Sequence, residues 1–395
     1  MVTSFGRAML DRWLLDPEIT YLNHGTVGAT PRVVLAAQTA IRDEIERQPS
    51  RFLLRELAGV GVGVPRRESS RLRAAAVLVA AFVGVREEDL VLIDNATTGV
   101  NAVLPSLSLE EGDELLLTDH AYGSVARTAA FVAARRGARV RTVTVPFPVR
   151  GPADLIEAIA GGIGPRTRIA VIDHITSLTA LVFPVAEIAA RCHSRGVPVL
   201  VDGAHAPGAV ALDVASLGVD WYAGNLHKWA FAPRPCGFLW AAPDRQATLH
   251  APIVSWGFGE GFPLEFDWAS TRDPSALLAG PAGIAFLREL GENAVRDHNH
   301  GLAREGSARL TRAWGTRLEA PPEMFGAMVT VPLPERAGAS DSDAERLRDA
   351  LLFEDRIEVQ LHAWRGRLHA RISAQVYNDL EDIGRLSAAV LARIG

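Results

Sequence analysis

Short apolar runs alternate with amphipathic segments from about residue 75 to residue 245, and this alternation limits the possible folds more than any other feature of the chain. Seven runs rich in β-branched residues are strand candidates: Leu90–Asp94, Glu114–Thr118, Val140–Val145, Arg168–Asp173, Pro198–Asp202, Asp220–Ala223 and Gly237–Ala241. Segments with the apolar spacing of helices separate several of them: Thr98–Leu107, Ser124–Arg136, Asp154–Ala160 and Val185–Arg195. Near-continuous apolar strands separated by helices indicate a mostly parallel sheet that is covered on both faces. The sequence therefore predicts an α/β fold with a mostly parallel seven-stranded sheet flanked by helices.

The pattern changes after a segment rich in Gly, Pro and aromatic residues, Trp256 to Pro274. A long helix is predicted over Ala294–Trp314, followed by a strand over Ala327–Pro332, a helix over Asp341–Phe353, strands over Ile357–Leu361 and Leu368–Ile372, and a helix over Asp379–Ile394. This order is typical of a small α+β domain. We expect an N-terminal segment, residues 1–20, that packs near the small domain, a large domain over residues 21–265, and a linker helix with the small C-terminal domain over residues 266–395.

The composition excludes several classes of protein. The net charge of −5 gives no basic surface for nucleic acid or acidic membranes, so neither partner is expected. No apolar run reaches the roughly 20 residues that span a bilayer, and the charged N-terminus lacks the apolar core of a secretory signal. Two cysteines, Cys192 and Cys236, are too few for a disulfide scaffold or a Cys-rich metal site. We expect a cytoplasmic protein without a metal.

Lysine occurs once, at Lys228, although 41 residues are lysine or arginine. A preference for arginine codons replaces lysine wherever a surface charge is enough, so a retained lysine suggests a task that arginine cannot perform. Arginine stays protonated in proteins, whereas lysine can become a neutral amine and form a Schiff base. The residues around Lys228 indicate whether it has this role.

Lys228, in WYAGNLHKWAF, follows Asp202, in VLVDGAHAPG, by 26 residues, and each comes after a predicted strand. Ligands of parallel sheets bind at the carboxyl ends of the strands. A buried carboxylate needs a positive partner, and a protonated pyridine nitrogen is one. An aldehyde held between the two residues would react with the amine while the aspartate keeps the ring nitrogen protonated, as pyridoxal phosphate requires. The alternative is a turn-capping Asp202 and a surface Lys228; the single lysine favours the cofactor.

These residues resemble the fold-type I pyridoxal-phosphate enzymes of the class V aminotransferase family. Within it the chain is most similar to the isopenicillin N epimerase-like branch, which also contains C–S lyases of cysteine conjugates. The resemblance covers nearly the whole chain and is carried by DPEITYLNHGTVGATPR, DNATTGVNAV, LLLTDHAYGS, VDGAHAPG, AGNLHKW, STRDPSA and RISAQVYN.

The resemblance implies that Ala96, through its backbone, and Thr97 bind the cofactor phosphate. The start of a helix favours an anion through its free amides and its dipole, although the same residues could form a simple N-cap. Either His120 or Tyr122, in DHAYG, is expected to stack on the pyridine ring. Both remain candidates.

Three more residues beside the two central ones are expected to contact the cofactor. The resemblance implies that His205 contacts the ring or its phenolic oxygen. Asn225 and His227 resemble residues that bind the phosphate next to the lysine. A histidine beside a motif is often only packed, so these roles depend on geometry.

The resemblance also implies a set of substrate residues. Arg371, in ARISAQVYN, matches an arginine that binds the substrate α-carboxylate, for which the planar guanidinium is well suited. The N-terminal loop is expected to fold over the substrate through Asn23, His24 and Gly25.

Two further matches imply a homodimer with shared active sites. Thr271, in STRDPSA, resembles a residue that reaches the phosphate of the neighbouring subunit. Arg55, in RFLLREL, matches an arginine of the branch that contacts either the substrate carboxylate or the dimer partner.

The expected activity is therefore that of a pyridoxal-phosphate enzyme acting on an amino acid through an external aldimine and an α-carbanion. Lys228 would be the general base and Asp202 the partner of the ring nitrogen. Epimerisation comes first by resemblance and needs a second acid, Tyr122 or His24. C–S lysis of a cysteine conjugate or sulfoxide is the alternative. Transamination and a non-catalytic binding protein are less favoured, as is a persulfide-forming desulfurase, because QLHAWRGRLHARIS carries no cysteine.

Overall fold

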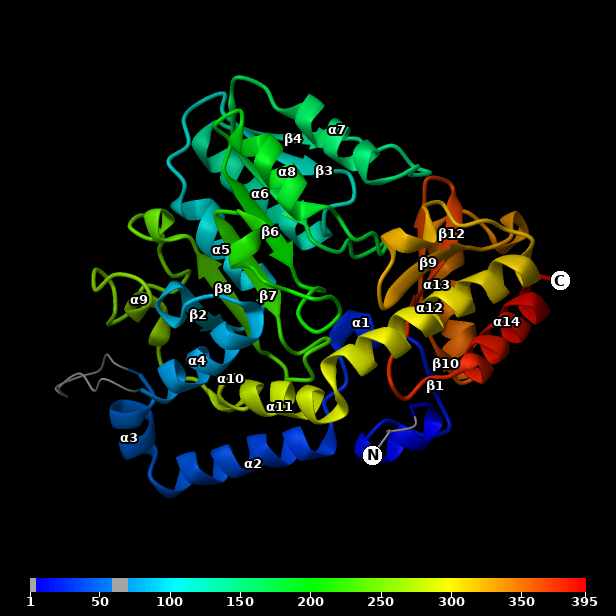
Figure 1. The fold of residues 1–395 in the computed structure, drawn as a ribbon, viewed down its shortest axis with the longest axis horizontal. Coiled ribbons are helices and arrows are strands. Elements are labelled where there is room, and N and C mark those ends of the chain that lie inside the picture. Colours follow the sequence, from blue (N-terminus) through cyan, green and yellow to red (C-terminus); the bar gives the residue numbers. More distant parts are fainter. Residues whose placement is uncertain (1–4, 59–69) are drawn as a thin grey trace.

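A computed structural model describes residues 5–58 and 70–395. Its large domain is built on a seven-stranded sheet in the order β2-β8-β7-β6-β5-β3-β4 (Figure 1). The strands are β2 Leu90–Ile93, β3 Glu114–Thr118, β4 Arg139–Val143, β5 Thr167–Asp173, β6 Val199–Gly203, β7 Trp221–Asn225 and β8 Gly237–Ala241. Neighbouring strands from β4 to β7 are parallel, and only β8 runs antiparallel to its neighbours β7 and β2. The predicted mostly parallel seven-stranded sheet is confirmed.

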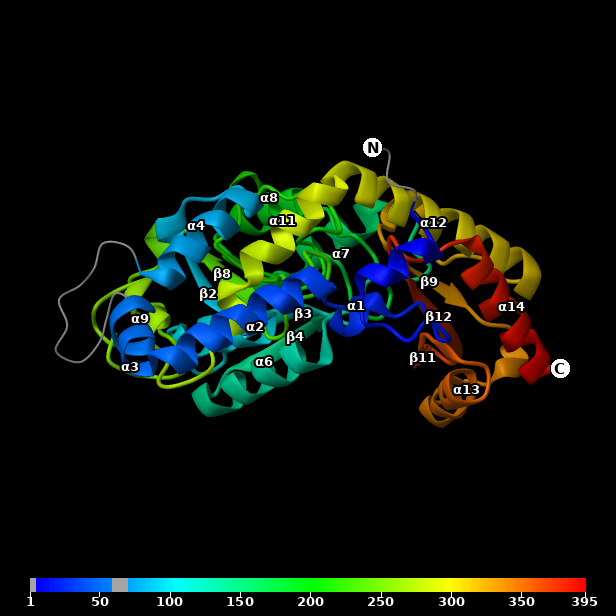
Figure 2. The same ribbon diagram turned by 90° about the horizontal axis from the view of Figure 1, so that it is seen from below.

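Helices cover both faces of this sheet, because its strands are apolar on both sides. One core contains residues of α4 Arg71–Val83, α7 Pro152–Gly162 and α8 Val185–His193. The other contains residues of α5 Ala96–Ser106 and α6 Gly123–Arg136. Figure 2 shows α4 and α8 on one side of the molecule and α6 on the other.

The small domain packs helices against a three-stranded antiparallel sheet in the order β11-β12-β9. Its elements are α12 Glu292–Trp314, β9 Met328–Pro332, α13 Asp341–Phe353, β11 Gln360–Trp364, β12 Arg367–Ser373 and α14 Leu380–Ile394. In β12, Leu368, Ala370 and Ile372 belong to the core of the small domain, whereas Arg371 lies on the other face of the strand and donates to the Ser177 carbonyl of the large domain. This alternation is what brings a small-domain arginine toward the large domain.

The predicted strand Ile357–Leu361 is wrong in one respect, because the chain changes sheets within it. β10 Ile357–Glu358 pairs in parallel with β1 Thr20–Tyr21, and β11 begins at Gln360 as part of another sheet. The cause is a partner from the N-terminal segment, which a local apolar pattern does not reveal.

The N-terminal segment lies against the small domain. The Gly6 amide donates to the Val376 carbonyl at 2.8 Å, and Arg7 pairs with Asp382 at 3.1 Å. Residues 1–4 of the predicted segment lie outside the described residues. The segment contains η1 Arg7–Arg12 and leads to α1 His24–Val27.

Further helices connect these units: α2 Arg32–Arg47, α3 Pro49–Arg51, η2 Phe52–Glu56, α9 Leu264–Asp267, α10 Ser275–Leu278 and α11 Gly280–Leu290. Single turns complete the chain: η3 Glu87–Asp89, η4 Ala215–Leu217, η5 Pro243–Arg245, η6 Pro322–Met324 and η7 Glu335–Ala337. In Figure 1, α11 and α12 lead from the large domain to the small one. Within residues 5–58 and 70–395, none of the helices has the length and apolar character to cross a bilayer.

Candidate active site

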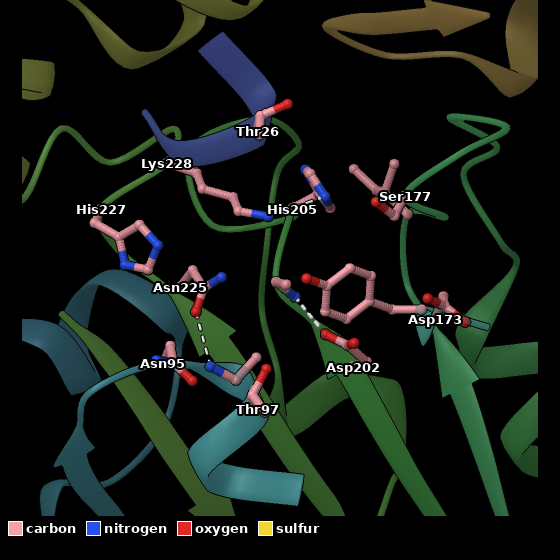
Figure 3. A pocket seen from close by; sticks show the side chains of 14 residues that line it. Thr26, Asn95, Thr97, Asp173, Ser177, Asp202, His205, Asn225, His227 and Lys228 are labelled. Atoms are coloured by element: carbon pink, nitrogen blue, oxygen red, sulfur yellow. Dashed lines mark hydrogen bonds between the residues drawn. The ribbon is translucent and has the colours of Figure 1, made fainter. Parts of the chain in front are cut away.

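A pocket of about 190 Å³ lies where the polar ends of the parallel strands converge. Five strands, β2, β3, β5, β6 and β7, contribute residues at or after their carboxyl ends, where ligands of such sheets bind. The pocket is lined by Thr26, Asn95, Ala96, Thr97, Tyr122, Asp173, Ile175, Ser177, Asp202, Ala204, His205, Asn225, His227 and Lys228 (Figure 3). Eight of these had been predicted as site residues: Ala96, Thr97, Tyr122, Asp202, His205, Asn225, His227 and Lys228.

Lys228 lies in the loop after β7 and projects into the pocket toward His205 (Figure 3). Its Nζ is 3.1 Å from His205 Nε2. Burial lowers the pKa of Lys228 to about 7, with a further lowering by the charge of Arg371 and an opposing effect of Asp202. An amine with this pKa is substantially neutral near pH 7, so it can act as a nucleophile or a base.

Asp202 is the penultimate residue of β6, and its carboxyl group accepts a hydrogen bond from the Ala204 amide at 3.0 Å. Burial raises its pKa. Across the described ranges, no arginine, lysine or histidine lies within ion-pair distance of it. Its partner in the register of the neighbouring strand is Asp173, whose pKa is raised well above the usual value by burial and by the charge of Asp202. A cation on a ligand would satisfy this carboxylate-rich wall.

His205 lies between these two groups and has one ring nitrogen in use. Nε2 contacts Lys228 Nζ, whereas the buried Nδ1 has no hydrogen-bond partner among the residues that the structure describes. Burial, followed by the charges of Lys228 and Arg371, lowers the pKa of His205 well below its usual value. The neutral imidazole thus leaves one polar atom free for a ligand.

The opposite end of the pocket is formed by the start of α5. Asn95 caps the helix by accepting from the Thr98 amide at 3.0 Å, and the Ala96 amide donates to Asn225 Oδ1 at 2.8 Å. Ala96 and Asn225 therefore satisfy each other. The first-turn amide and the hydroxyl of Thr97 have no intrahelical acceptor and suit an anion at this helix start.

His227 lines the same end, and its Nδ1 is 2.9 Å from the Cys236 carbonyl oxygen. Burial lowers its pKa to about 4, so the imidazole is neutral near pH 7.

Arg371 reaches the edge of the pocket from β12 of the small domain. Its Nη1 donates to the Ser177 carbonyl at 2.6 Å, and its Nη2 donates to the Thr26 hydroxyl at 2.6 Å. Only 3% of the residue is exposed, yet it has no carboxylate partner within the part of the chain that the structure describes. Burial lowers its pKa to about 10. A buried guanidinium held by neutral acceptors is suited to an anionic ligand.

Tyr122 and His120, the two candidates for stacking, occupy different positions. Tyr122 lines the pocket. His120 lies behind the pocket wall, 2% exposed, where Nδ1 is 2.7 Å from the Thr179 hydroxyl. Its ring packs against Phe147 and Trp364 at centroid distances of 5.6 and 5.2 Å.

The N-terminal loop surrounds the pocket without lining it at the three predicted residues. Asn23 Oδ1 accepts from the Thr26 hydroxyl at 2.5 Å and lies 3.4 Å from Arg371 Nη2. His24 Nε2 contacts the Lys228 carbonyl at 2.8 Å and its Nδ1 contacts the Tyr377 hydroxyl at 2.7 Å, so both ring nitrogens are occupied. Gly25 is buried. These residues position Arg371 and the backbone of Lys228.

Arg55 and Thr271 lie on the surface, outside the pocket of this chain. Arg55 is exposed and donates to the Ser50 carbonyl at 3.1 Å. Thr271 is exposed in the segment between α9 and α10, beside Arg272, which pairs with Asp94 at 3.0 Å.

Sequence reasoning missed four polar residues of the pocket: Thr26, Asn95, Asp173 and Ser177. Asp173 ends a predicted strand, so its position at a carboxyl edge was a usable signal. Asn95 and Thr26 adjoin predicted site residues in the same motifs. Ser177 carries no signal of its own, since its role comes from the contact with Arg371.

Pyridoxal phosphate fits this set of residues. Lys228 offers an amine that can react with the aldehyde. Asp202 offers a buried carboxyl group that can pair with the ring nitrogen. His205 offers a buried ring nitrogen, Nδ1, that has no hydrogen-bond partner among the described residues. Thr97 at the start of α5, with His227 nearby, would hold the phosphate.

Comparisons with known proteins place the chain among related enzymes. Residues 36–386 match the family described as aminotransferase class-V. A probable chloroplastic L-cysteine desulfhydrase of Arabidopsis thaliana is 34% identical over 95% of this chain and 83% of its own length. An isopenicillin N epimerase of Streptomyces clavuligerus is 35% identical over 97% of each chain.

Two solved structures resemble the fold. A cystine C–S lyase, determined with its product cysteine persulfide, has a TM-score of 0.75 and 25% identity and covers 94% of this chain and 97% of its own. A cysteine desulfurase of Thermococcus onnurineus has a TM-score of 0.78 over 99% of this chain and 98% of its own, but its 18% identity supports the fold alone.

Proposed function

We propose, because the chain belongs to the class V aminotransferase family of pyridoxal-phosphate-dependent enzymes, that it is a C–S lyase of small sulfur amino acids. Cleavage of cysteine with one water would release hydrogen sulfide, pyruvate and ammonia. The observation that carries this proposal is a small pocket with a near-neutral base, Lys228, while His24, one of the two residues expected as a second acid, has both ring nitrogens occupied.

Arg371 binds the α-carboxylate of the substrate in this proposal. Its guanidinium is buried and bonded to neutral oxygens of Ser177 and Thr26, which leaves its charge uncompensated. A carboxylate supplies the missing charge and accepts two parallel hydrogen bonds. The substrate class is therefore an amino acid, with its α-carbon held near Lys228.

Lys228 removes the α-proton as general base. When bound, pyridoxal phosphate supplies an electron sink for the negative charge that develops at the α-carbon. Asp202 would hold the proton of the ring nitrogen, Thr97 and His227 would hold the phosphate, and Tyr122 would pack on the ring. The amine of Lys228 suits its task, because a pKa of about 7 keeps much of it unprotonated at neutral pH.

The departure of a thiolate needs no second acid, since a cysteine thiol has a pKa of about 8.5. Epimerisation does need one, on the face away from the base. His24 is unsuited, because both of its ring nitrogens are occupied. The Tyr122 hydroxyl has no hydrogen-bond partner among residues 5–58 and 70–395 that would hold it toward the α-carbon. Elimination is the reaction that the available groups support best.

The burial of both cysteine side chains also disfavours a persulfide mechanism. Cys192 and Cys236 are both buried. Burial raises the pKa of Cys192 to about 11 and also raises the pKa of Cys236. Transfer of sulfur to a protein thiol needs an accessible thiolate, which neither residue offers.

Epimerisation is the second candidate, supported by the 35% identity with an isopenicillin N epimerase over 97% of each chain. In this alternative Tyr122, as a pocket residue with a phenolic proton, would return the proton to the α-carbon.

The deciding experiment incubates purified holoenzyme with L-cysteine and S-substituted L-cysteines in D2O. Pyruvate and thiol are measured together with deuterium and configuration at Cα of the recovered amino acid. The lyase predicts equimolar pyruvate and thiol, lost in Lys228→Ala and retained in Tyr122→Phe. Recovery of deuterated D-amino acid without pyruvate, abolished by Tyr122→Phe, would instead establish epimerisation and overturn the lyase proposal.

We also propose a homodimer in which Arg55 and Thr271 act at the partner's site. Support comes from their exposure outside this chain's pocket and from the segment before Thr271, whose apolar side chains are largely exposed: Ile253 53%, Val254 67%, Trp256 65% and Phe258 57%. A partner subunit would cover this surface.

A further inference from the structure

The turn between β11 and β12 has an unusual residue at its tip. Arg365 has a φ of 47° and Gly366 a φ of 78°, so both residues of this two-residue turn are left-handed. Hairpin turns of this kind favour Asn-Gly, because side chains other than Asn and Asp are disfavoured in that region. An arginine at the first position therefore needs compensating contacts.

Arg365 finds those contacts in the large domain rather than in its own hairpin. Its Nη2 donates to Asp119 Oδ2 at 2.8 Å and to the Val145 carbonyl at 3.0 Å. Its Nη1 donates to the Phe147 carbonyl at 3.3 Å. The guanidinium also lies 5.6 Å from the ring centroids of both Phe147 and Trp364. One side chain thus joins the two domains through three acceptors and the Phe147 ring of the large domain, while Trp364 of its own hairpin flanks it.

Asp119 connects Arg365 to the segment that carries Tyr122. Its other oxygen, Oδ1, accepts from the Val145 amide at 3.0 Å, and its own amide donates to the Val143 carbonyl at 2.9 Å. Tyr122 follows three residues later and lines the same pocket as Asp173. His120, between the two, is enclosed by Phe147 and by Trp364 of the hairpin.

The same hairpin carries the arginine assigned to the substrate carboxylate. Arg371 lies on β12, six residues after Arg365, and docks on the large domain through Ser177. We propose that Arg365 is a positioning residue, which clamps the β11–β12 hairpin to Asp119 and so fixes Tyr122 and Arg371 relative to each other. Its kinetic consequences rest on the proposed function, whereas its structural consequences do not.

An ordinary surface ion pair contributes little to stability. The Arg365–Asp119 pair differs, because both side chains are mostly covered, at 35% and 23% exposure, and because further hydrogen bonds and stacked rings fix its geometry. The residues that would hold the cofactor phosphate lie on the large domain alone. Loss of the clamp should therefore weaken substrate binding and leave cofactor binding almost unchanged.

The test compares Arg365→Ala, Arg365→Lys, Asp119→Asn and the double variant Arg365→Ala/Asp119→Asn with the wild-type protein. Arg367→Ala is the matched control, since Arg367 lies in the same hairpin but donates to the Leu333 carbonyl of its own domain. Amide hydrogen exchange over residues 119–122 and at Val145 is measured on the cofactor-free protein, alongside the dissociation constant of pyridoxal phosphate. KM and kcat for the best sulfur amino acid follow on the holoenzyme.

We expect Arg365→Ala to raise amide exchange over residues 119–122 and KM by about tenfold each, the effect of one charge-assisted contact. The kcat and the cofactor dissociation constant should change less than about threefold. Arg365→Lys should reduce both increases in part, because lysine restores the positive charge but not the several donors of the planar guanidinium. Asp119→Asn should add little to Arg365→Ala.

Unchanged exchange in Arg365→Ala would overturn the proposal even if the enzyme proves not to be a lyase, because that measurement needs no substrate. If Arg367→Ala changes amide exchange and KM as much as Arg365→Ala does, Arg365 has no specific positioning role. The same conclusion follows if Arg365→Ala lowers kcat, cofactor affinity and melting temperature together and Arg365→Lys restores none of them. Raised exchange with an unchanged KM in an active lyase would also refute the coupling to Arg371.

Discussion

The pKa of Lys228 provides the sharpest test of the electrostatics of the pocket. Burial and the charge of Arg371 lower it from 10.5 to about 7. At pH 7 roughly half of the amine is then neutral, whereas an ordinary lysine is neutral in roughly one molecule in 3000. Because only the neutral amine attacks an aldehyde, the rate of covalent capture reports this fraction directly.

The assay mixes cofactor-free protein with pyridoxal and cyanoborohydride and follows the mass of the peptide that contains Lys228. Pyridoxal is used because the second ionisation of a phosphate, near pH 6, would otherwise distort the profile. Since Lys228 is the only lysine, labelling elsewhere is limited to the chain terminus. We expect the rate to rise about tenfold between pH 6 and pH 8 and then to level off. An ordinary lysine would give a rise of about a hundredfold without a plateau.

Replacement of Arg371 by methionine separates the two causes of the lowered Lys228 pKa, which are burial and the charge of Arg371. Removal of the cation should move the midpoint to higher pH, so that capture at pH 7 becomes slower. Burial is the larger cause, so the midpoint should stay below 10.5. Arg367→Met serves as the control from the same strand. A wild-type midpoint near 10.5 would refute the desolvation argument, and an unmoved midpoint in Arg371→Met would refute the contribution of Arg371.

Three further predictions address other parts of the pocket. Asp202→Asn keeps an acceptor for the Ala204 amide but loses the charge, so turnover should fall about 100-fold or more while the cofactor still binds. Gly25→Ala places a methyl group 2.5 Å from Met328 Sδ and should cost about 1–3 kcal/mol of unfolding free energy, measured by urea denaturation. If sites are shared between subunits, mixing inactive Lys228→Ala protein with an inactive Thr271 variant should restore part of the activity; exchange of subunits without recovery would exclude that arrangement.

Most of the sheet was predictable from sequence because its strands, apart from the exposed edge strand β4, are almost entirely buried on both faces. Such strands read as continuous apolar runs, and the predicted bounds of β3 and β8 coincide with those observed. Parallel topology then dictates that the residues after these strands converge. This is why Asp202 and Lys228, distant in sequence, could be expected to share a pocket.

The parts of the pocket that depend on contacts with the small domain were not predictable in the same way. His120 and Tyr122 have equivalent positions in the sequence, and what separates them is Trp364, which lies more than 240 residues away and encloses His120. The partners of Arg371 come from two other segments, at Thr26 and Ser177. Contacts of this kind depend on how the small domain packs on the large one, and no local pattern encodes that packing.

In the proposed function, Arg371 would link substrate binding to the basicity of Lys228. In the free pocket its positive charge lowers the pKa of Lys228 and so favours the neutral amine that captures the cofactor. A substrate carboxylate on Arg371 would neutralise this charge, and the pKa of Lys228 would rise because one cause of its depression is removed. The amine would then be a stronger base at the moment when an α-proton must be removed. One arginine, brought to the pocket by the small domain, would thus favour cofactor loading while the proposed carboxylate site is empty and proton removal once it is filled.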